Sequence, residues 1–148
     1  MILGIPAGLL SLLVLSAILW LTLAPQPLPD NDLPLFPGAD KVVHALMFGG
    51  LYFILALDLA MWRLTRRGGE CRKAPAVGKP KFLPASWAFV FALFACLFGG
   101  GIELAQGAMG MGRGCDILDF YADVAGVLLS VSITPPILRL LFGTRGQS

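Results

Sequence analysis

The sequence predicts an all-α fold: a polytopic membrane protein with four transmembrane helices packed as a bundle. Two observations carry this prediction. Of the 148 residues, 57% are hydrophobic and 14% are charged, whereas charged residues make up about 25% of a typical soluble domain. The apolar residues also fall into four blocks, each close to the roughly 20 residues that cross the hydrocarbon core of a bilayer as a helix. We expect residues 1–148 to form a single domain.

The first two blocks cover about residues 2–23 and 42–62. The first contains no charged side chain, and a secretory signal is its alternative interpretation. A signal would have a basic segment and a shorter apolar run of about 7–15 residues, so we expect a retained transmembrane helix. The second block is interrupted by His44 and Asp58. We interpret Asp58 as a structural residue that reaches the membrane interface beside the basic loop that follows.

The last two blocks cover about residues 83–106 and, from residue 117 onward, the region up to Phe142. Within the fourth block, Pro135 and Pro136 each remove a backbone donor and clash with the preceding turn. The sequence therefore predicts that the fourth span is limited to residues 117–134. Residues 137–148 are expected to form a short C-terminal extension, which begins as a kinked continuation or an interfacial helix.

The basic residues predict the orientation of the chain. Segment 63–82 carries seven of the eleven lysines and arginines, and loops rich in these residues stay on the cytoplasmic side. With four spans, both termini are then cytoplasmic, and the protein is a multi-pass protein of the cytoplasmic membrane. A nucleic-acid patch is the alternative for this segment. Its place between two spans makes the topological role sufficient, so we expect membrane lipids and no nucleic acid as partners.

Most other ionisable groups gather at the predicted outer ends of the helices. The candidate ligand-binding residues are Asp40, Lys41, His44, Glu103, Gln106, Arg113, Asp116, Asp119 and Asp123. At 100° per residue, the last three aspartates fall within an arc of about 60° and share one stripe of the fourth helix. Three acids on one stripe cannot face lipid, so we expect them to face the bundle.

Some of these residues have a structural interpretation. Asp40 and Asp116 suit helix N-caps, and Asp119 can contact the same cap region, where acids also complement the helix dipole. His44 lies one turn after Asp40, whose carboxylate could accept its ring proton. A ligand, a proton carrier and a structural residue all remain open for this histidine.

Glu103 and Asp123 lie too deep for capping. Asp123 is two turns into its helix, and Glu103 is about one turn inside the end of another. A charge at such depth costs a few kcal/mol unless it is paired or hydrated, so a buried ionisable residue is a functional candidate. The alternative is structural pairing, with Arg113 and Lys41 as counter-ions.

Glycines lie beside both deep acids. Gly99, Gly100 and Gly101 precede Glu103, and Gly126 follows Asp123 by three residues. Small residues let neighbouring helices approach closely in a membrane. We expect such packing to close the inner end of a polar pocket that opens outward.

Three motifs, in order, resemble the VanZ-like family of small bacterial integral membrane proteins. They are DKVVH (Asp40, Lys41, His44), GIELAQ (Glu103, Gln106) and GRGCDILDFYADVAG (Arg113, Asp116, Asp119, Asp123, Gly126). The matches extend over four spans and nearly the whole chain. The family usually has asparagine where this chain has Asp123, which adds a potential negative charge. Because the founding member is related to teicoplanin resistance, the resemblance implies a role at the cell envelope, in the bacterial inner membrane.

The expected function is binding of a polar or lipid-linked head group, such as a cell-wall precursor, in the outer-face pocket, with an influence on glycopeptide sensitivity. One alternative is an accessory structural subunit that contacts other membrane protein subunits. Another is a membrane-embedded enzyme with Glu103 or His44 as general base and Lys41 or Arg113 stabilising phosphate charge. The sequence shows no defined nucleophile, which argues against an enzyme.

A metal ion is a further alternative for the acidic residues. His44 together with Glu103 and the aspartates of the fourth helix could bind a divalent cation. Spacing along the chain does not give the geometry of such contacts. The sequence alone therefore predicts no metal and no cofactor.

Overall fold

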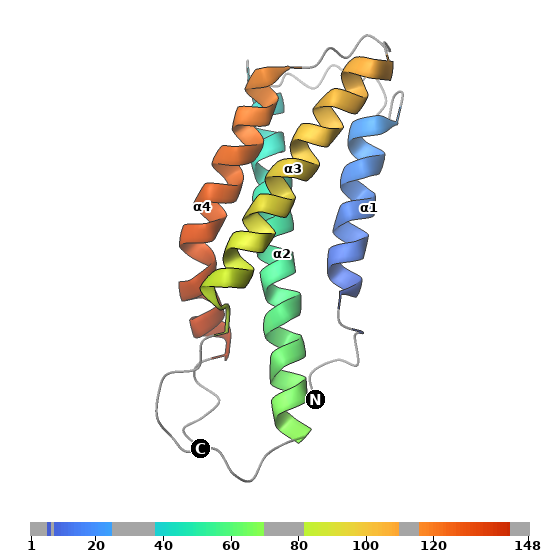
Figure 1. The fold of residues 1–148 in the computed structure, drawn as a ribbon. Helices are drawn as coiled ribbons and strands as arrows, with labels where there is room; N and C mark the ends of the chain where they lie inside the picture. The colour runs from blue at the N-terminus through green and yellow to red at the C-terminus, as the bar shows by residue number, and fades with distance from the viewer. Residues whose placement is uncertain (1–5, 7, 25–37, 70–81, 110–115, 143–148) are drawn as a thin grey trace.

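The computed structural model describes residues 6, 8–24, 38–69, 82–109 and 116–142, and among them it contains four α-helices. The helices are α1 (Leu9–Leu23), α2 (Ala39–Gly69), α3 (Ala85–Met109) and α4 (Ile117–Phe142). They run alternately in opposite directions along the bundle (Figure 1). The predicted all-α fold with four helices is confirmed.

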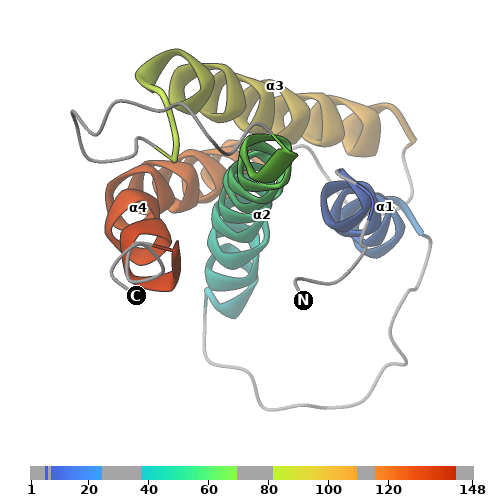
Figure 2. The same ribbon diagram turned by 90° about the horizontal axis from the view of Figure 1, so that it is seen from below.

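Helix α2 is the centre of the bundle. It contacts the three other helices, most extensively α4, and α1 packs against α2 and α3 but not against α4. Viewed from below, α1 and α4 lie on opposite sides of α2, with α3 across them (Figure 2). At the upper end in Figure 1, α1 and α3 end while α2 and α4 begin. We call this the site end, and the other the opposite end.

Three of the helices are long and apolar enough to cross a membrane: Ala39–Arg66 of α2, α3 and α4. Large apolar side chains are exposed on their outer faces, including Leu46, Leu104, Leu128 and Leu140. Such a surface suits lipid rather than water. The fourth, α1, is apolar but has 15 residues. At 1.5 Å per residue it is about 22 Å long, shorter than the roughly 30 Å hydrocarbon core.

The first two helices differ in their bounds from the prediction. Helix α1 begins at Leu9 rather than near residue 2, because Gly8 has a left-handed φ of 87° and forms the N-cap. Helix α2 begins at Ala39 and continues to Gly69, seven residues past the predicted end and into the predicted basic loop. Its extra turns contain good helix formers, and the Arg66 guanidinium lies 4.5 Å from the centre of the Trp62 ring.

The fourth helix extends past residue 134, where the sequence predicts the end of the fourth span. Helix α4 continues through Pro135 and Pro136 to Phe142. Membrane helices tolerate proline where neighbouring helices and Ser or Thr side chains compensate for the freed backbone groups. After the prolines, Leu138 is fully buried in an apolar cluster with Ala56 and Ala60 of α2. This packing holds the last turns in a helix that the local sequence disfavours. Helix α3 differs little from its predicted span.

The contact between α2 and α4 is close because both helices have a glycine there. A Cβ on Gly126 would overlap the carbonyl oxygen of Ala45, and a Cβ on Gly49 would lie 2.9 Å from the carbonyl oxygen of Gly126. Phe48 and Tyr52, which lie on either side of Gly49 along α2, belong to the main apolar core and are fully buried. The close approach places the first turns of α2 directly against those of α4, at the site end.

Candidate functional site

Lys41 forms the outer layer of a polar cluster at the site end. Its Nζ donates to Asp40 Oδ2 at 2.9 Å, to Asp119 Oδ1 at 3.1 Å and to Asp116 Oδ2 at 3.4 Å. These ion pairs join the start of α2 to the start of α4. Asp40 lies within the first turn of α2 and is not its N-cap, because the Gly38 carbonyl accepts the first backbone hydrogen bonds there. The expectation of a cap at Asp40 is therefore corrected.

Asp116 connects helix capping to Glu103. Its Oδ1 accepts the backbone N–H of Leu118 at 2.8 Å, which confirms the predicted N-cap of α4. Its own N–H donates to Glu103 Oε2 at 3.1 Å. Glu103 of α3 thus contacts Asp116, the residue that precedes α4. Asp119, which was the second candidate for a capping role, instead binds Lys41 on α2.

His44 and Asp123 form the inner layer of the cluster. His44 Nδ1 lies 2.9 Å from Asp123 Oδ1, and its Nε2 lies 3.9 Å from Asp119 Oδ2. The expected contact from Asp40 to His44 is not made, because Asp40 binds Lys41. The Phe48 ring stacks against the imidazole with 6.5 Å between the ring centres. His44 is therefore fixed by an acid of another helix and an aromatic ring of its own.

The three aspartates of α4 become more buried with depth. The exposed fraction of the side chain falls from 42% for Asp116 to 17% for Asp119 and 1% for Asp123. This gradient agrees with the predicted inward stripe. The predicted pairing of Lys41 with the deep acids is not observed. Lys41 binds the two outer aspartates, and His44 is the partner of Asp123. Arg113 lies outside the described residues.

Gly99 makes room for the buried carboxylate of Asp123. A Cβ on Gly99 would lie 2.7 Å from Asp123 Oδ2 and 3.2 Å from the Phe48 ring. Both distances are shorter than normal carbon contacts of about 3.5–4.0 Å. Gly101, two residues later, has open space around the corresponding position. The glycine run therefore contains one residue whose small size the cluster requires, which the sequence alone could not single out.

Gln106 does not join the acidic cluster. Its Nε2 donates to the Thr22 carbonyl at 2.9 Å, and the side chain is buried. It thereby links the end of α3 to the end of α1. Glu103 and Gln106 follow each other by one turn of α3 but contact different neighbours, so the structure favours a packing role for Gln106.

A groove between α3 and α4 reaches two of the acids. Its volume is about 420 Å³. Most of its lining is apolar, and Glu103 and Asp116 are its two acidic residues. The remaining lining residues are Cys96, Leu97, Gly100, Gly101, Leu104, Ile117 and Phe120. Among the described residues, the polar site is thus a network of ion pairs around Lys41 with an apolar groove beside it.

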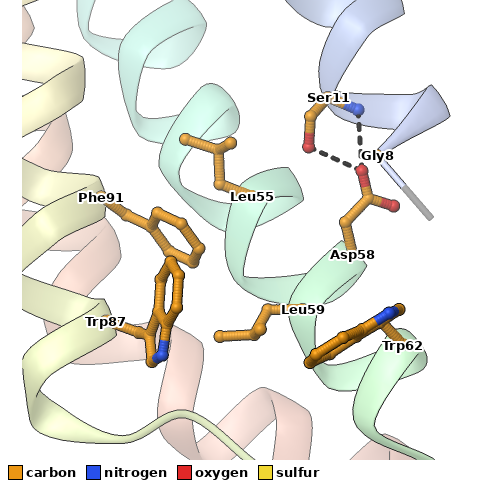
Figure 3. Close-up of a pocket in the computed structure, with 8 residues that line it drawn as sticks. All are labelled: Gly8, Ser11, Leu55, Asp58, Leu59, Trp62, Trp87 and Phe91. Carbon is orange, nitrogen blue, oxygen red and sulfur yellow. Dashed lines mark hydrogen bonds between the residues drawn. The ribbon is translucent and has the colours of Figure 1, made fainter. Parts of the chain in front are cut away.

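The opposite end contains a third buried acid, Asp58, which binds the start of α1. Its Oδ2 accepts the backbone N–H of Ser11 at 2.9 Å and the Ser11 hydroxyl at 2.6 Å (Figure 3). Ser11 is the third residue of α1, so Asp58 supplies from α2 the acceptor that the N-terminus of α1 lacks. These contacts support the structural interpretation of Asp58, whose side chain is 5% exposed. A pocket of about 370 Å³ beside it is mostly apolar.

The chemistry of the site is that of an acceptor of protons and cations. Among the described residues of the cluster, five are acids and two, Lys41 and His44, are bases. His44, Glu103 and Asp123 each offer a possible metal-ligand atom, and these atoms lie within 4.8 Å of one another. Hydrogen-bond donors and cations are the ligands that such a group favours.

Comparison with known proteins gives no relative. No family model matches the chain, and no curated protein or solved structure matches it either. The resemblance to the VanZ-like family therefore stays a prediction from the three motifs. The function must be inferred from the geometry of the cluster and the groove.

Proposed function

We propose that the chain is an integral protein of the bacterial inner membrane that binds the head group of an amphiphile at its site end. In this proposal the site end faces outward and both termini are cytoplasmic. The basic segment after α2 supports this orientation, because lysine- and arginine-rich loops remain cytoplasmic. Membership of the VanZ-like family, and an influence on glycopeptide sensitivity, belong to the same proposal and rest on the motifs.

The groove between α3 and α4 is the observation that carries the proposal. Its lining is apolar over most of its length and acidic at Glu103 and Asp116. A lipid has the same division, with a hydrocarbon chain and a polar end. The hydrocarbon chain of the lipid would lie against Leu97 and Leu104. Hydroxyl or amine groups of its head group would donate hydrogen bonds to the carboxylates of Glu103 and Asp116. The volume of about 420 Å³ lies within the usual range of small-molecule pockets.

Mass spectrometry of lipid that copurifies with the protein in a mild detergent tests the proposal. We expect one lipid class to be enriched over its fraction in the membrane. Gly101→Leu adds a large side chain to the groove lining, at a position where nothing lies within 4 Å of the added Cβ. It should remove the enrichment. Gly50→Leu is the matched control, since Gly50 is exposed on α2 and also has open space.

Other outcomes would change the proposed function. Two results would contradict binding in the groove. The first is copurified lipid with the same composition as the membrane, and the second is equal lipid enrichment in Gly101→Leu and Gly50→Leu. A stoichiometric protein partner with no enriched lipid would favour the accessory subunit. The orientation is tested separately by labelling cysteines from outside intact cells after Cys96→Ala has removed the cysteine of α3. Cys115 should be labelled and Cys71 protected.

A further inference from the structure

We propose that the inner layer of the cluster is a binding site for one divalent transition-metal ion, with His44, Glu103 and Asp123 as ligands. These residues come from α2, α3 and α4, so the ion would join three helices at the site end. The sequence predicts no metal, and the inference comes from the geometry. It goes beyond amphiphile binding and does not depend on it.

The distances between the three side chains suit a metal. One ligand atom from each lies within 4.8 Å of the others. His44 Nδ1 and Asp123 Oδ1 are 2.9 Å apart. Zinc–nitrogen and zinc–oxygen bonds are about 2.0–2.2 Å long and structural zinc sites are tetrahedral, so two neighbouring ligand atoms are about 3.4 Å apart. Separations of up to 4.8 Å would therefore shorten by up to about 1.4 Å when the ion binds.

Two carboxylate oxygens of the site have no partner among the described residues. They are Glu103 Oε1 and Asp123 Oδ2, and both are buried. The exposed fractions of these residues are 3% and 1%. A buried acceptor without a donor or cation is costly, far more so when it carries charge. Both oxygens belong to residues of the proposed ligand group, so a cation there would satisfy them together.

The backbone of α3 favours convergence of the two carboxylates. Asp123 Oδ2 lies against Gly99, at 2.7 Å from the position of a Cβ there. Glu103 follows Gly99 by one helical turn and shares its face of α3. The missing side chain at Gly99 leaves space for the Asp123 carboxylate, on the face of α3 that also carries Glu103.

The charges of the cluster also call for a cation in the inner layer. Lys41, the one lysine of the cluster, is bound by Asp40, Asp116 and Asp119. Among the described residues, Glu103 and Asp123 are left with His44, which carries at most one positive charge. A divalent ion would neutralise both carboxylates while the imidazole remains uncharged.

The ligand types indicate which ions fit. Magnesium and calcium take oxygen ligands almost exclusively, and magnesium keeps several waters. An imidazole with two carboxylates suits zinc, manganese or iron(II), and zinc binds such ligands more tightly than manganese does. Zinc is therefore the probe for the test.

The test uses the full-length protein, purified in detergent without a histidine tag and stripped of metal with a chelator. After incubation with zinc and removal of the excess, elemental mass spectrometry should find about one zinc per folded chain. Glu103→Gln and Asp123→Asn should each weaken zinc binding at least about tenfold in calorimetric titration. Asp58→Asn is the matched control, because it changes a buried carboxylate at the opposite end. It should retain full binding.

Gly99→Ala and Gly101→Ala separate loss of the site from loss of the fold. Gly99→Ala intrudes on the Asp123 carboxylate, whereas Gly101→Ala enters open space. Only the first should lower zinc affinity while circular dichroism shows unchanged helix content. Wild-type protein that stays helical and binds well under one zinc per chain would overturn the proposal. So would unchanged affinity in both carboxylate variants, or displacement of zinc by an equal concentration of magnesium.

Discussion

Replacing Gly126 by alanine tests whether the close contact of α2 and α4 holds the site together. A Cβ on Gly126 would overlap the Ala45 carbonyl oxygen and lie 2.7 and 2.8 Å from the carbonyl carbon and Cα of that residue. Contacting carbon atoms are normally about 3.5–4.0 Å apart, so the helices would have to separate by about 1 Å. Because Ala45 adjoins His44, this movement lengthens the 2.9 Å contact to Asp123 beyond hydrogen-bond range.

We expect Gly126→Ala to lower the free energy of unfolding by about 2–3 kcal/mol. Overfilling a packed contact costs about 1–3 kcal/mol, and the upper part of this range applies because backbone atoms cannot turn away as side chains do. Loss of a polar contact between membrane helices adds about 0.6 kcal/mol on average. The higher helix propensity of alanine offsets about 0.5–1 kcal/mol.

The assay is unfolding of the purified protein in mixed micelles with an increasing fraction of sodium dodecyl sulfate, followed by circular dichroism. Gly50→Ala makes the same chemical change on the exposed face of α2, where nothing lies within 4 Å of the added Cβ. It should leave the stability unchanged or raise it by up to about 1 kcal/mol. If Gly126→Ala unfolds at the same detergent fraction as Gly50→Ala, the proposed close contact is refuted.

Three other substitutions give distinct results in the same protein. Asp58→Ala removes the acceptor of two hydrogen bonds from Ser11 and should cost about 2–3 kcal/mol in the detergent unfolding assay; Asp58→Asn, which keeps an acceptor oxygen, should cost less. Gln106→Leu removes the hydrogen bond to the end of α1 and should cost about 1 kcal/mol without changing zinc binding, measured by calorimetry. Lys41→Met leaves three aspartates without their shared cation, so the yield of monodisperse protein in size-exclusion chromatography should fall, and Lys41→Arg should restore it.

The sequence predicts the number and kind of helices well, because each apolar block is long enough to require a helix in lipid. It predicts their ends less well. A local rule for proline predicts that the fourth span ends before Pro135, whereas α4 continues and buries Leu138 between helices. The apolar block of the second span predicts an end near residue 62. Arg63 and Leu64 continue the helix, since leaving the apolar block does not by itself end a helix.

The sequence predicts which residues gather at the acidic site, but not which side chains pair with one another. Helical periodicity correctly put the aspartates of α4 on an inward stripe. It could not choose between Asp40 and Asp123 as the partner of His44, because that choice depends on how closely α2 and α4 approach. The approach is set by Gly126 meeting Ala45. The acceptor that Asp58 provides for Ser11, 47 residues away, likewise has no local signal.

Glu103 belongs to both proposed binding sites, the groove and the metal site. One carboxylate oxygen accepts the Asp116 N–H, and the other is buried without a partner among the described residues. The side chain belongs both to the metal-ligand group and to the lining of the groove. Carboxylates alone would repel the phosphate of a lipid-linked head group, so an acidic groove by itself favours a hydroxyl or amine. A divalent ion held between Glu103, His44 and Asp123 would reverse that preference, because it adds positive charge at the polar end of the groove. If both proposals hold, removal of metal should therefore change which head groups copurify, from phosphate-bearing lipids to uncharged or cationic ones.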